Sequence, residues 1–222
     1  MDHITWGRRM TVELVIFDCD GVLVDSEPTS DQILAANLTR HGLPISPHEI
    51  HTLFAGGTIH GVGEEATRRG ANLSPDWVDT TYAEIFAELR KGVPVIPGVI
   101  DLIHALDRAG IKRAIASNGP IAKMEISLNP SGLLTLFQDR IYSGHDHRPK
   151  PAPDMLQRIM ADMGIAPEHT VMIDDMPAGF NAARAAGVRC FGYVADGDPA
   201  RIGDTGAEPV TSMAQIAQAL QL

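Results

Sequence analysis

Acidic residues at two places along the chain have the type and spacing needed to bind a metal ion. Asp18 and Asp20 follow an apolar run and are separated by one residue, and Asp174-Asp175 follow another apolar run. Residues two apart on an extended strand point to the same face, so Asp18 and Asp20 can reach one ligand. Four carboxylates in one crevice raise one another's pKa unless positive charge is present. Oxygen ligands without a cysteine or histidine cluster favour a hard cation, which predicts Mg²⁺ as the cofactor.

The two carboxylates of the first pair can take different roles in a phosphoryl transfer. Asp18, beside the metal, is the predicted nucleophile, because an ionised carboxylate can form an aspartyl phosphate. Asp20 lies further along the Gly21 turn. We expect Asp20 to protonate the leaving oxygen as a general acid and then to deprotonate water as a general base.

Polar and basic residues follow two further apolar runs. Ser117 and Asn118 offer a hydroxyl and an amide to phosphoryl oxygens. Lys150 would neutralise developing charge and hold the nucleophile, so it is a predicted catalytic and substrate-binding residue together with Ser117. Lys123, one turn into the next helix, is a candidate contact for an anionic substrate tail, with a solvated lysine as the alternative. His60, in a glycine-rich stretch, is a candidate substrate contact, with a surface loop as the alternative.

Short apolar, β-branched runs predict buried strands joined by helices. The expected strands are at residues 11–17, 112–116, 140–143, 170–173 and 188–194, and the expected helices between them are at 101–109, 153–163 and 177–186. This alternation predicts an α/β fold with right-handed crossovers and a mostly parallel sheet. Ligand sites in such sheets lie at the carboxyl ends of the strands, where all four polar clusters fall.

One segment interrupts the alternation of strands and helices. Between about Ser26 and Leu89 the sequence has helical patterns punctuated by glycines and no strand-like run. Its borders fall near Asp25 and in the proline-containing stretch at 93–98, where the backbone is restricted. We therefore expect residues 11–25 and 94–222 to form the catalytic core and residues 26–93 to form an inserted helical cap.

The bulk properties restrict the partners. A formal net charge of −10 opposes binding to nucleic acid, and no uninterrupted apolar stretch is long enough for a membrane span. The opening ten residues do not have the order of a signal peptide, and two cysteines in apolar runs are typical of a reducing cytoplasm. The expected partner is a small phosphorylated metabolite, for a monomer or weak homo-oligomer in the cytoplasm.

Four motifs together resemble the signatures of the haloacid dehalogenase-like (HAD) hydrolase superfamily. They are FDCDGVLVDSE (17–27), ASNG (116–119), KPAPDML (150–156) and IDDMPAGFNAARAAG (173–187). The resemblance covers about 11–194 and implies a Rossmann-like core, a helical cap inserted after the first strand, and an aspartyl-phosphate intermediate. It also implies that Mg²⁺ is held by Asp18, the Asp20 backbone carbonyl, Asp174 and Asp175.

Within the superfamily, the chain is similar to the β-phosphoglucomutase and phosphatase branch. The stretches SNGPIAKM (117–124) and SGHDHRPKP (143–151) most resemble the 6-phosphogluconate phosphatase-like members. Two departures are visible: Met176 stands where these proteins usually have Ser, and Cys19 where they usually have a larger apolar residue. The resemblance implies hydrolysis of a sugar phosphate or a phosphosugar acid such as 6-phosphogluconate.

Other functions stay open at this point. A β-phosphoglucomutase-type phosphosugar mutase resembles this core but usually carries a basic residue in the cap loop, where this chain has GGTIHG (56–61). A dehalogenase needs neither a metal nor an acid, so Asp20 and Asp174-Asp175 argue against it. A phosphorylation-dependent signalling module or an inactive binding protein is the non-enzyme alternative, although signalling receivers have another order of clusters. His145 and His147 have a metal-like spacing but are read as loop residues.

Overall fold

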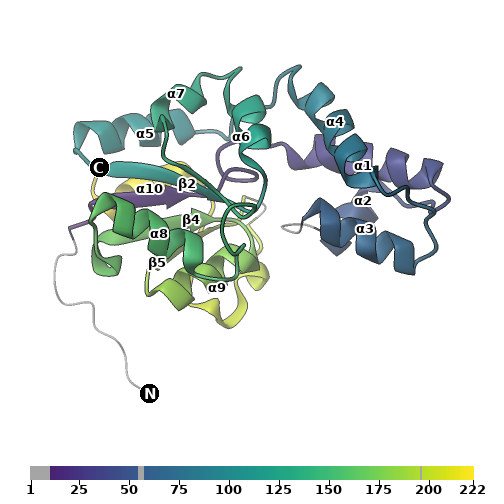
Figure 1. Ribbon diagram of the computed structural model, residues 1–222. Coiled ribbons are helices and arrows are strands. Elements are labelled where there is room, and N and C mark those ends of the chain that lie inside the picture. Colours follow the sequence, from purple (N-terminus) through teal and green to yellow (C-terminus); the bar gives the residue numbers. More distant parts are fainter. Residues whose placement is uncertain (1–10, 55–57, 196) are drawn as a thin grey trace.

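A parallel sheet forms the centre of the computed structural model, which describes residues 11–54, 58–195 and 197–222 (Figure 1). Within these residues the sheet has six strands in the order β3-β2-β1-β4-β5-β6. The strands are β1 (Leu14–Phe17), β2 (Lys112–Ser117), β3 (Ile141–Ser143), β4 (Thr170–Asp174), β5 (Arg189–Tyr193) and β6 (Glu208–Val210). Each pair of neighbours is parallel, as the alternation of strands and helices predicts.

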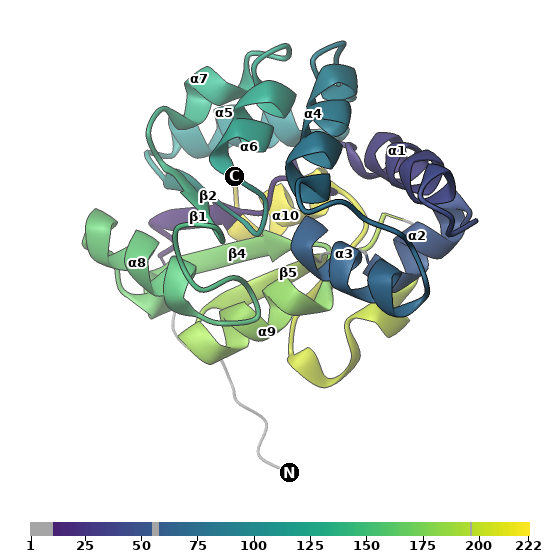
Figure 2. The ribbon, with the colours of Figure 1, turned by 45° about the vertical axis from the view of Figure 1, so that its right-hand side comes forward.

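Helices cover both faces of the sheet. One face carries α5 (Val99–Arg108), α6 (Ile121–Leu128), α7 (Leu133–Phe137) and α10 (Met213–Leu220), and the other carries α8 (Asp154–Met163) and α9 (Pro177–Ala186). Figure 2 shows α5, α6 and α7 above the strands and α9 below them. Val15 and Phe17 of β1 pack into the first layer, whereas Leu14 and Ile16 pack into the second. Because both faces are covered, β1 is apolar throughout rather than alternating.

Four helices inserted after β1 form a cap beside the sheet. They are α1 (Glu27–Arg40), α2 (Pro47–Phe54), α3 (Ile59–Arg68) and α4 (Trp77–Leu89), on the right of Figure 1. They share their own apolar cluster around Leu38, Trp77 and Leu89, and the Trp77 indole donates to Asn37 Oδ1 at 2.7 Å. The predicted fold class, a Rossmann-like parallel sheet with an inserted helical cap, is therefore confirmed. No helix of the described residues is long and apolar enough to cross a membrane.

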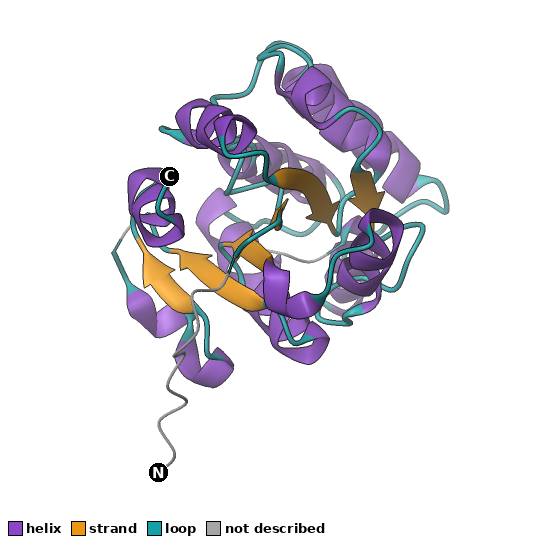
Figure 3. Ribbon diagram, turned by 90° about the vertical axis from the view of Figure 1, so that its left-hand side faces the viewer, coloured by secondary structure: helices purple, strands orange, loops and turns teal. Residues whose placement is uncertain are grey.

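The C-terminal part of the chain contains elements that the sequence patterns did not predict. The edge strand β6 has only three residues, of which Glu208 and Pro209 are exposed. An edge strand with a proline does not produce the long apolar run that indicates a central strand. α10 follows β6 and packs against α5, which completes one face of the sheet. Figure 3 shows this last helix, next to the marker for the C-terminus, beside the strands.

Candidate active site

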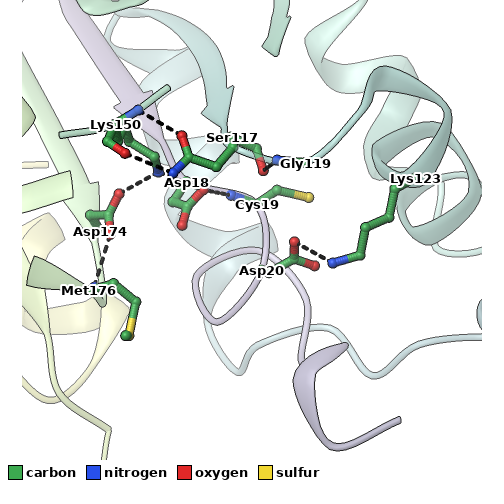
Figure 4. A network of polar contacts seen from close by, with 10 residues as sticks. Asp18, Cys19, Asp20, Ser117, Gly119, Lys123, Lys150, Asp174 and Met176 are labelled. Atoms are coloured by element: carbon green, nitrogen blue, oxygen red, sulfur yellow. Dashed lines mark hydrogen bonds and ion pairs between the residues drawn. The ribbon is translucent and has the colours of Figure 1, made fainter. Parts of the chain in front are cut away.

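Three neighbouring strands bring predicted catalytic side chains to one edge of the sheet. β1 lies between β2 and β4, and Phe17 is level with Ile173. The Asp18 backbone N–H continues this pairing by donating to the Ile173 carbonyl at 2.9 Å. Asp18 therefore lies beside Asp174, the last residue of β4, and Ser117 ends β2 on the other side. Figure 4 shows these side chains together at the carboxyl ends of the strands, where the parallel topology predicts a ligand site.

Lys150 connects two of the carboxylates from the loop that follows β3. Its Nζ lies 2.9 Å from Asp18 Oδ1 and 2.7 Å from Asp174 Oδ2, and the residue is only 5% exposed. Burial lowers the pKa of Lys150, but the adjacent Asp174 and Asp18 carboxylates outweigh burial and raise the pKa above its ordinary value. Lys150 thus stays protonated and places a fixed positive charge beside Asp18.

Asn118 holds the loop that carries Lys150. Its Oδ1 accepts a hydrogen bond from the Lys150 backbone N–H at 2.7 Å, and its Nδ2 donates to the Lys150 carbonyl at 3.0 Å. This pairing gives Asn118 a positioning role that no local pattern indicates, because its partner lies 32 residues further along the chain. Asn118 also lines the cavity at the sheet edge, and its predicted contact with substrate stays a prediction.

Three aspartates have the arrangement of a cation site. One carboxylate oxygen from each of Asp18, Asp174 and Asp175 lies within 4.8 Å of the other two, and all three residues are buried. Asp175 Oδ1 has no hydrogen-bond partner among the described residues. A buried acceptor without a partner is costly, and a cation bound between these oxygens would remove that cost. The donor set, carboxylate oxygens alone, fits Mg²⁺.

The pKa values of the same aspartates point in the same direction. Burial raises the pKa of Asp18 to about 7; Lys150 lowers it in part, while Asp174 and Asp20 raise it further. Burial also raises the pKa of Asp175 well above its usual range, and the charges of Asp174 and Asp18 add to this effect. Without a cation, two of the three carboxyl groups therefore resist ionisation. A divalent ion favours the ionised forms, so these residues fit the predicted metal.

Asp20 has surroundings different from those of Asp18. Lys123 Nζ lies 2.7 Å from Asp20 Oδ2, and the Ser26 hydroxyl donates to Asp20 Oδ1. Burial raises the pKa of Asp20, but the charge and hydrogen bond of Lys123 and the hydrogen bond of Ser26 outweigh burial, so the pKa is lowered. Figure 4 shows the Asp20–Lys123 pair apart from Asp174. The predicted metal contact of Asp20, through its backbone carbonyl, stays a prediction.

A cavity between the cap and the sheet edge contains this centre. Its core-side wall includes the predicted residues Asp18, Asp20, Ser117, Asn118, Lys123, Lys150, Asp174 and Asp175. The Ser117 hydroxyl accepts a hydrogen bond from the Gly119 N–H at 3.2 Å, and Ser117 is buried. His60 is exposed on α3 and is not among the described lining residues, although its neighbour Ile59 is. A substrate contact of His60 thus gains no support and stays a prediction.

The histidines of the loop after β3 lie outside the acidic centre. The cluster of three aspartates is the potential metal site within the described residues, and it includes neither His145 nor His147. His145 Nε2 is 3.5 Å from the Tyr82 hydroxyl of the cap, and the His147 ring lies beside Tyr142. The reading of both histidines as loop residues agrees with these positions.

The cap contributes lining residues that sequence reasoning did not single out. Glu27, Ser30, Asp31 and Leu34 of α1 all face the cavity. They are spaced i, i+3, i+4 and i+7, which places them on one face of a helix. That spacing is visible in the sequence. It mixes two acidic residues with one apolar residue, so it does not have the form of a core-facing stripe.

Gly179, in the first turn of α9, has no side chain and so leaves room for the Asp174 carboxylate. A methyl group at Gly179 would overlap the Asp174 carboxylate. Asp174 has little freedom to move, because Lys150 holds Oδ2 at 2.7 Å and the Met176 N–H donates to Oδ1 at 2.9 Å. Gly179→Ala is therefore expected to weaken Mg²⁺ binding by about 10- to 100-fold, measured by calorimetric titration of the folded variant.

Gly61→Ala is a matched control for this substitution. Gly61 is also a helical glycine, but a methyl group there would meet only Thr58 Oγ1, at an ordinary 3.6 Å. We expect Mg²⁺ binding by Gly61→Ala to equal that of the wild type. Equal Mg²⁺ affinity of Gly179→Ala and the wild type would contradict the role of Gly179.

Comparisons with known proteins agree with this geometry. The haloacid dehalogenase-like hydrolase family matches residues 12–187. The chain is 29% identical to 6-phosphogluconate phosphatase of Escherichia coli over 83% of this chain and 84% of that protein, and 30% identical to hexitol phosphatase A of the same organism over 85% and 86%. A solved HAD family hydrolase from Deinococcus radiodurans, with bound phosphate and sodium, has a TM-score of 0.77 and 31% identity, covering 95% of this chain and 96% of that one.

The family match spans most of the chain and includes the residues that form the acidic centre. It covers β1 with Asp18, β2 with Ser117, the Lys150 loop, and β4 with Asp174 and Asp175. Relatives at about 30% identity over most of both chains are phosphatases. This chain therefore belongs to the haloacid dehalogenase-like hydrolase family, as an enzyme of its phosphatase and β-phosphoglucomutase branch.

Proposed function

We propose that the protein hydrolyses small phosphomonoesters with Mg²⁺ as cofactor and an aspartyl phosphate on Asp18 as intermediate. The observation that carries the proposal is the placement of Asp18: it contacts Lys150, lies beside the Asp174 and Asp175 carboxylates, and is followed by Asp20 with separate partners. The substrate range that we propose is sugar phosphates and phosphosugar acids. Relatives named for 6-phosphogluconate and for hexitol phosphates support this range.

In the first step, a carboxylate oxygen of Asp18 attacks the phosphorus and the bond from phosphorus to the ester oxygen breaks. Asp20 gives its proton to the departing oxygen, so that an alcohol leaves rather than an alkoxide. Lys123 and Ser26 hold Asp20 in its ionised form, so we expect Asp20 to exchange these partners for the substrate oxygen and to take up a proton from solvent before it donates. Lys150 holds Asp18 during the attack.

In the second step, water attacks the phosphorus of the aspartyl phosphate. Asp20, now ionised, removes a proton from this water, and the bond between phosphorus and the Asp18 oxygen breaks. Inorganic phosphate leaves, Asp18 returns to its carboxylate form and Asp20 regains its proton. The lowered pKa of Asp20 is consistent with the ionised state that this step requires.

The phosphoryl group needs positive charge and hydrogen-bond donors in both steps. Lys150 and the Ser117 hydroxyl line the cavity and are the proposed donors to its oxygens. Asp18, Asp174 and Asp175, with the Asp20 backbone carbonyl, would hold Mg²⁺. When bound, the ion would neutralise charge on the phosphoryl oxygens.

We propose that residues 26–93 act as the cap and residues 11–25 and 94–222 as the catalytic core. Two contacts between the connecting segments support these borders. The Asp25 N–H donates to the Pro94 carbonyl at 2.9 Å, and Val24 forms a β-bridge with Val95. The paired segments would serve as the hinge of a cap that closes over the substrate. A cytoplasmic location and a monomeric or weakly oligomeric state stay predictions.

The test is hydrolysis of p-nitrophenyl phosphate with excess Mg²⁺ and again after EDTA treatment. We expect turnover with Mg²⁺ and recovery of the rate when Mg²⁺ is restored after EDTA treatment. In EDTA the rate should be at least about 100-fold lower, because removing one strong electrostatic contribution to catalysis costs about this factor or more. Chelation removes the charge that the acidic centre and the phosphoryl group both require. Activity that persists in EDTA, or no activity on any phosphomonoester, would contradict the proposal.

A phosphomutase would need a second cationic subsite for the second phosphate of a sugar bisphosphate. Among the described residues that line the cavity, the lysines are Lys123 and Lys150, and both are paired with aspartates on the core side. This arrangement favours hydrolysis. Isomerisation of β-glucose 1-phosphate in the presence of a bisphosphate activator, faster than release of phosphate, would indicate the mutase instead.

A further inference from the structure

Two carboxylates line the cap side of the cavity, opposite the aspartate centre. Glu27 and Asp31 lie four residues apart on α1 and so share one face of that helix. Both face the cavity, and their side chains are 24% and 17% exposed. Neither has a role in the steps proposed above. We expect the part of a substrate remote from the phosphate to extend toward this wall of the cavity.

Negative charge dominates the cavity. Its described lining contains six carboxyl groups, from Asp18, Asp20, Glu27, Asp31, Asp174 and Asp175, against two ammonium groups, from Lys123 and Lys150, an excess of four when all are ionised. Residues 55–57 are Ala-Gly-Gly and carry no side-chain charge. Mg²⁺ would balance two of these charges, and a phosphate dianion would bring two more.

The imidazole beside the two cap carboxylates cannot balance both of them. His51 Nδ1 is 3.2 Å from Asp31 Oδ2 and 3.9 Å from Glu27 Oε2, and His51 is not among the described lining residues. An imidazole carries at most one positive charge against two carboxylates. Burial raises the pKa of Glu27, and the charges of Asp20 and Asp31 add to this, although His51 and Lys123 act in the opposite direction. Negative charge is thus already unfavourable in this part of the cavity.

Most of the remaining cap wall is apolar: Leu34, Ile50, Phe54, Ile59, Val62 and Ile85 line it, together with the hydroxyl-bearing residues Ser30, Thr58 and Tyr82. Repulsion between like charges is less screened in such surroundings than in water. An ionised carboxylate can only accept hydrogen bonds, so Glu27 and Asp31 can bind hydroxyl groups but not a second carboxylate.

We infer, resting on the proposed function, that the substrate is a phosphate ester of a polyhydroxy compound without a carboxylate, and that Glu27 and Asp31 make this distinction. They accept hydrogen bonds from substrate hydroxyl groups and repel a second negative charge. This selects sugar and sugar-alcohol phosphates from the proposed range and excludes phosphosugar acids such as 6-phosphogluconate. In this substrate preference the chain differs from the relative named for 6-phosphogluconate and resembles the relative named for hexitol phosphates.

A matched pair of substrates tests the inference. Glucitol 6-phosphate and 6-phosphogluconate have the same carbon chain and differ at the terminal carbon, which is a hydroxymethyl group in one and a carboxylate in the other. We expect kcat/KM of the wild type to be at least about tenfold higher for glucitol 6-phosphate. Glu27→Gln and Asp31→Asn should each reduce this ratio by at least about threefold, through a lower KM for 6-phosphogluconate.

Glu64→Gln is the control, because it changes the net charge equally and Glu64 is exposed on α3, outside the described cavity lining. Its substrate ratio should equal that of the wild type. Equal or higher kcat/KM for 6-phosphogluconate in the wild type, or an unchanged ratio in both cap variants, would overturn the inference while p-nitrophenyl phosphate is still hydrolysed. If the wild type does not hydrolyse p-nitrophenyl phosphate at all, that result contradicts the proposed function, and the inference with it.

Discussion

Asp18→Asn should lower kcat for p-nitrophenyl phosphate by about 10⁴-fold or more. The amide keeps the shape of the side chain but has no anionic oxygen to attack phosphorus. Asp18 cannot be replaced by another described group in the same position, because Asp174 is held by Lys150 and by the Met176 N–H. The measurement is steady-state hydrolysis at saturating Mg²⁺, combined with acid-quench trapping of a labile phosphoprotein, which only the wild type should form.

The control for Asp18→Asn is Asp101→Asn, an isosteric change at an exposed position on α5. Its kcat should equal that of the wild type. Circular dichroism and thermal melting establish that Asp18→Asn is folded, and calorimetry should still detect binding of a substrate that the variant does not turn over. Asp18→Asn activity within tenfold of the wild type would contradict the assignment of Asp18 as nucleophile.

The sheet could be predicted from the sequence because its central strands are buried on both faces. The five expected runs correspond closely to β1, β2, β3, β4 and β5, and the helix expected at 177–186 is α9 with the same bounds. The patterns fail at one edge of the sheet: the three residues of β6 include exposed Glu208 and Pro209, which burial does not constrain. Burial determines residue type in the centre of a parallel sheet much more strongly than at its edge.

The acidic centre could also be predicted, because parallel strands bring their carboxyl ends together whatever their separation in the sequence. The partners of the polar side chains could not. Lys123 pairs with Asp20, 103 residues away, and Asn118 pairs with the backbone of Lys150. Such contacts depend on side-chain direction and on loop path, and neither leaves a periodic signal in the sequence. The same reason applies to Glu27, whose place in the cavity depends on how the cap lies over the sheet.

Lys150→Met should have the largest effect on stability and should also lower kcat by about 100-fold or more. Lys150 is buried and contacts both Asp18 and Asp174, so its removal leaves two buried carboxylates without this cation. Removing one partner of a buried ion pair lowers the free energy of unfolding by about 3–5 kcal/mol. We expect a loss of this size for the metal-free protein at pH 8, measured by urea denaturation.

The pH dependence of that loss distinguishes a charge effect from a packing effect. The pKa of Asp18 is raised from 3.8 to about 7 in the folded protein, so between these values the folded state holds a proton that the unfolded state has released. The stability of the metal-free protein therefore falls as pH rises through this window. Lys150 lowers the pKa of Asp18, so Lys150→Met should move the pKa upward and extend the loss of stability to higher pH.

The destabilisation caused by Lys150→Met should accordingly be smaller at pH 5, where Asp18 is already protonated, than at pH 8, where the wild type keeps it ionised. Mg²⁺ should restore part of the stability at pH 8, since the cation replaces the missing positive charge. Lys91→Met removes an exposed lysine paired with Glu88 and should change the free energy of unfolding by no more than about 0.5 kcal/mol. If Lys150→Met lowers the free energy of unfolding equally at both pH values, Lys150 has a packing role, and its charge does not stabilise ionised Asp18.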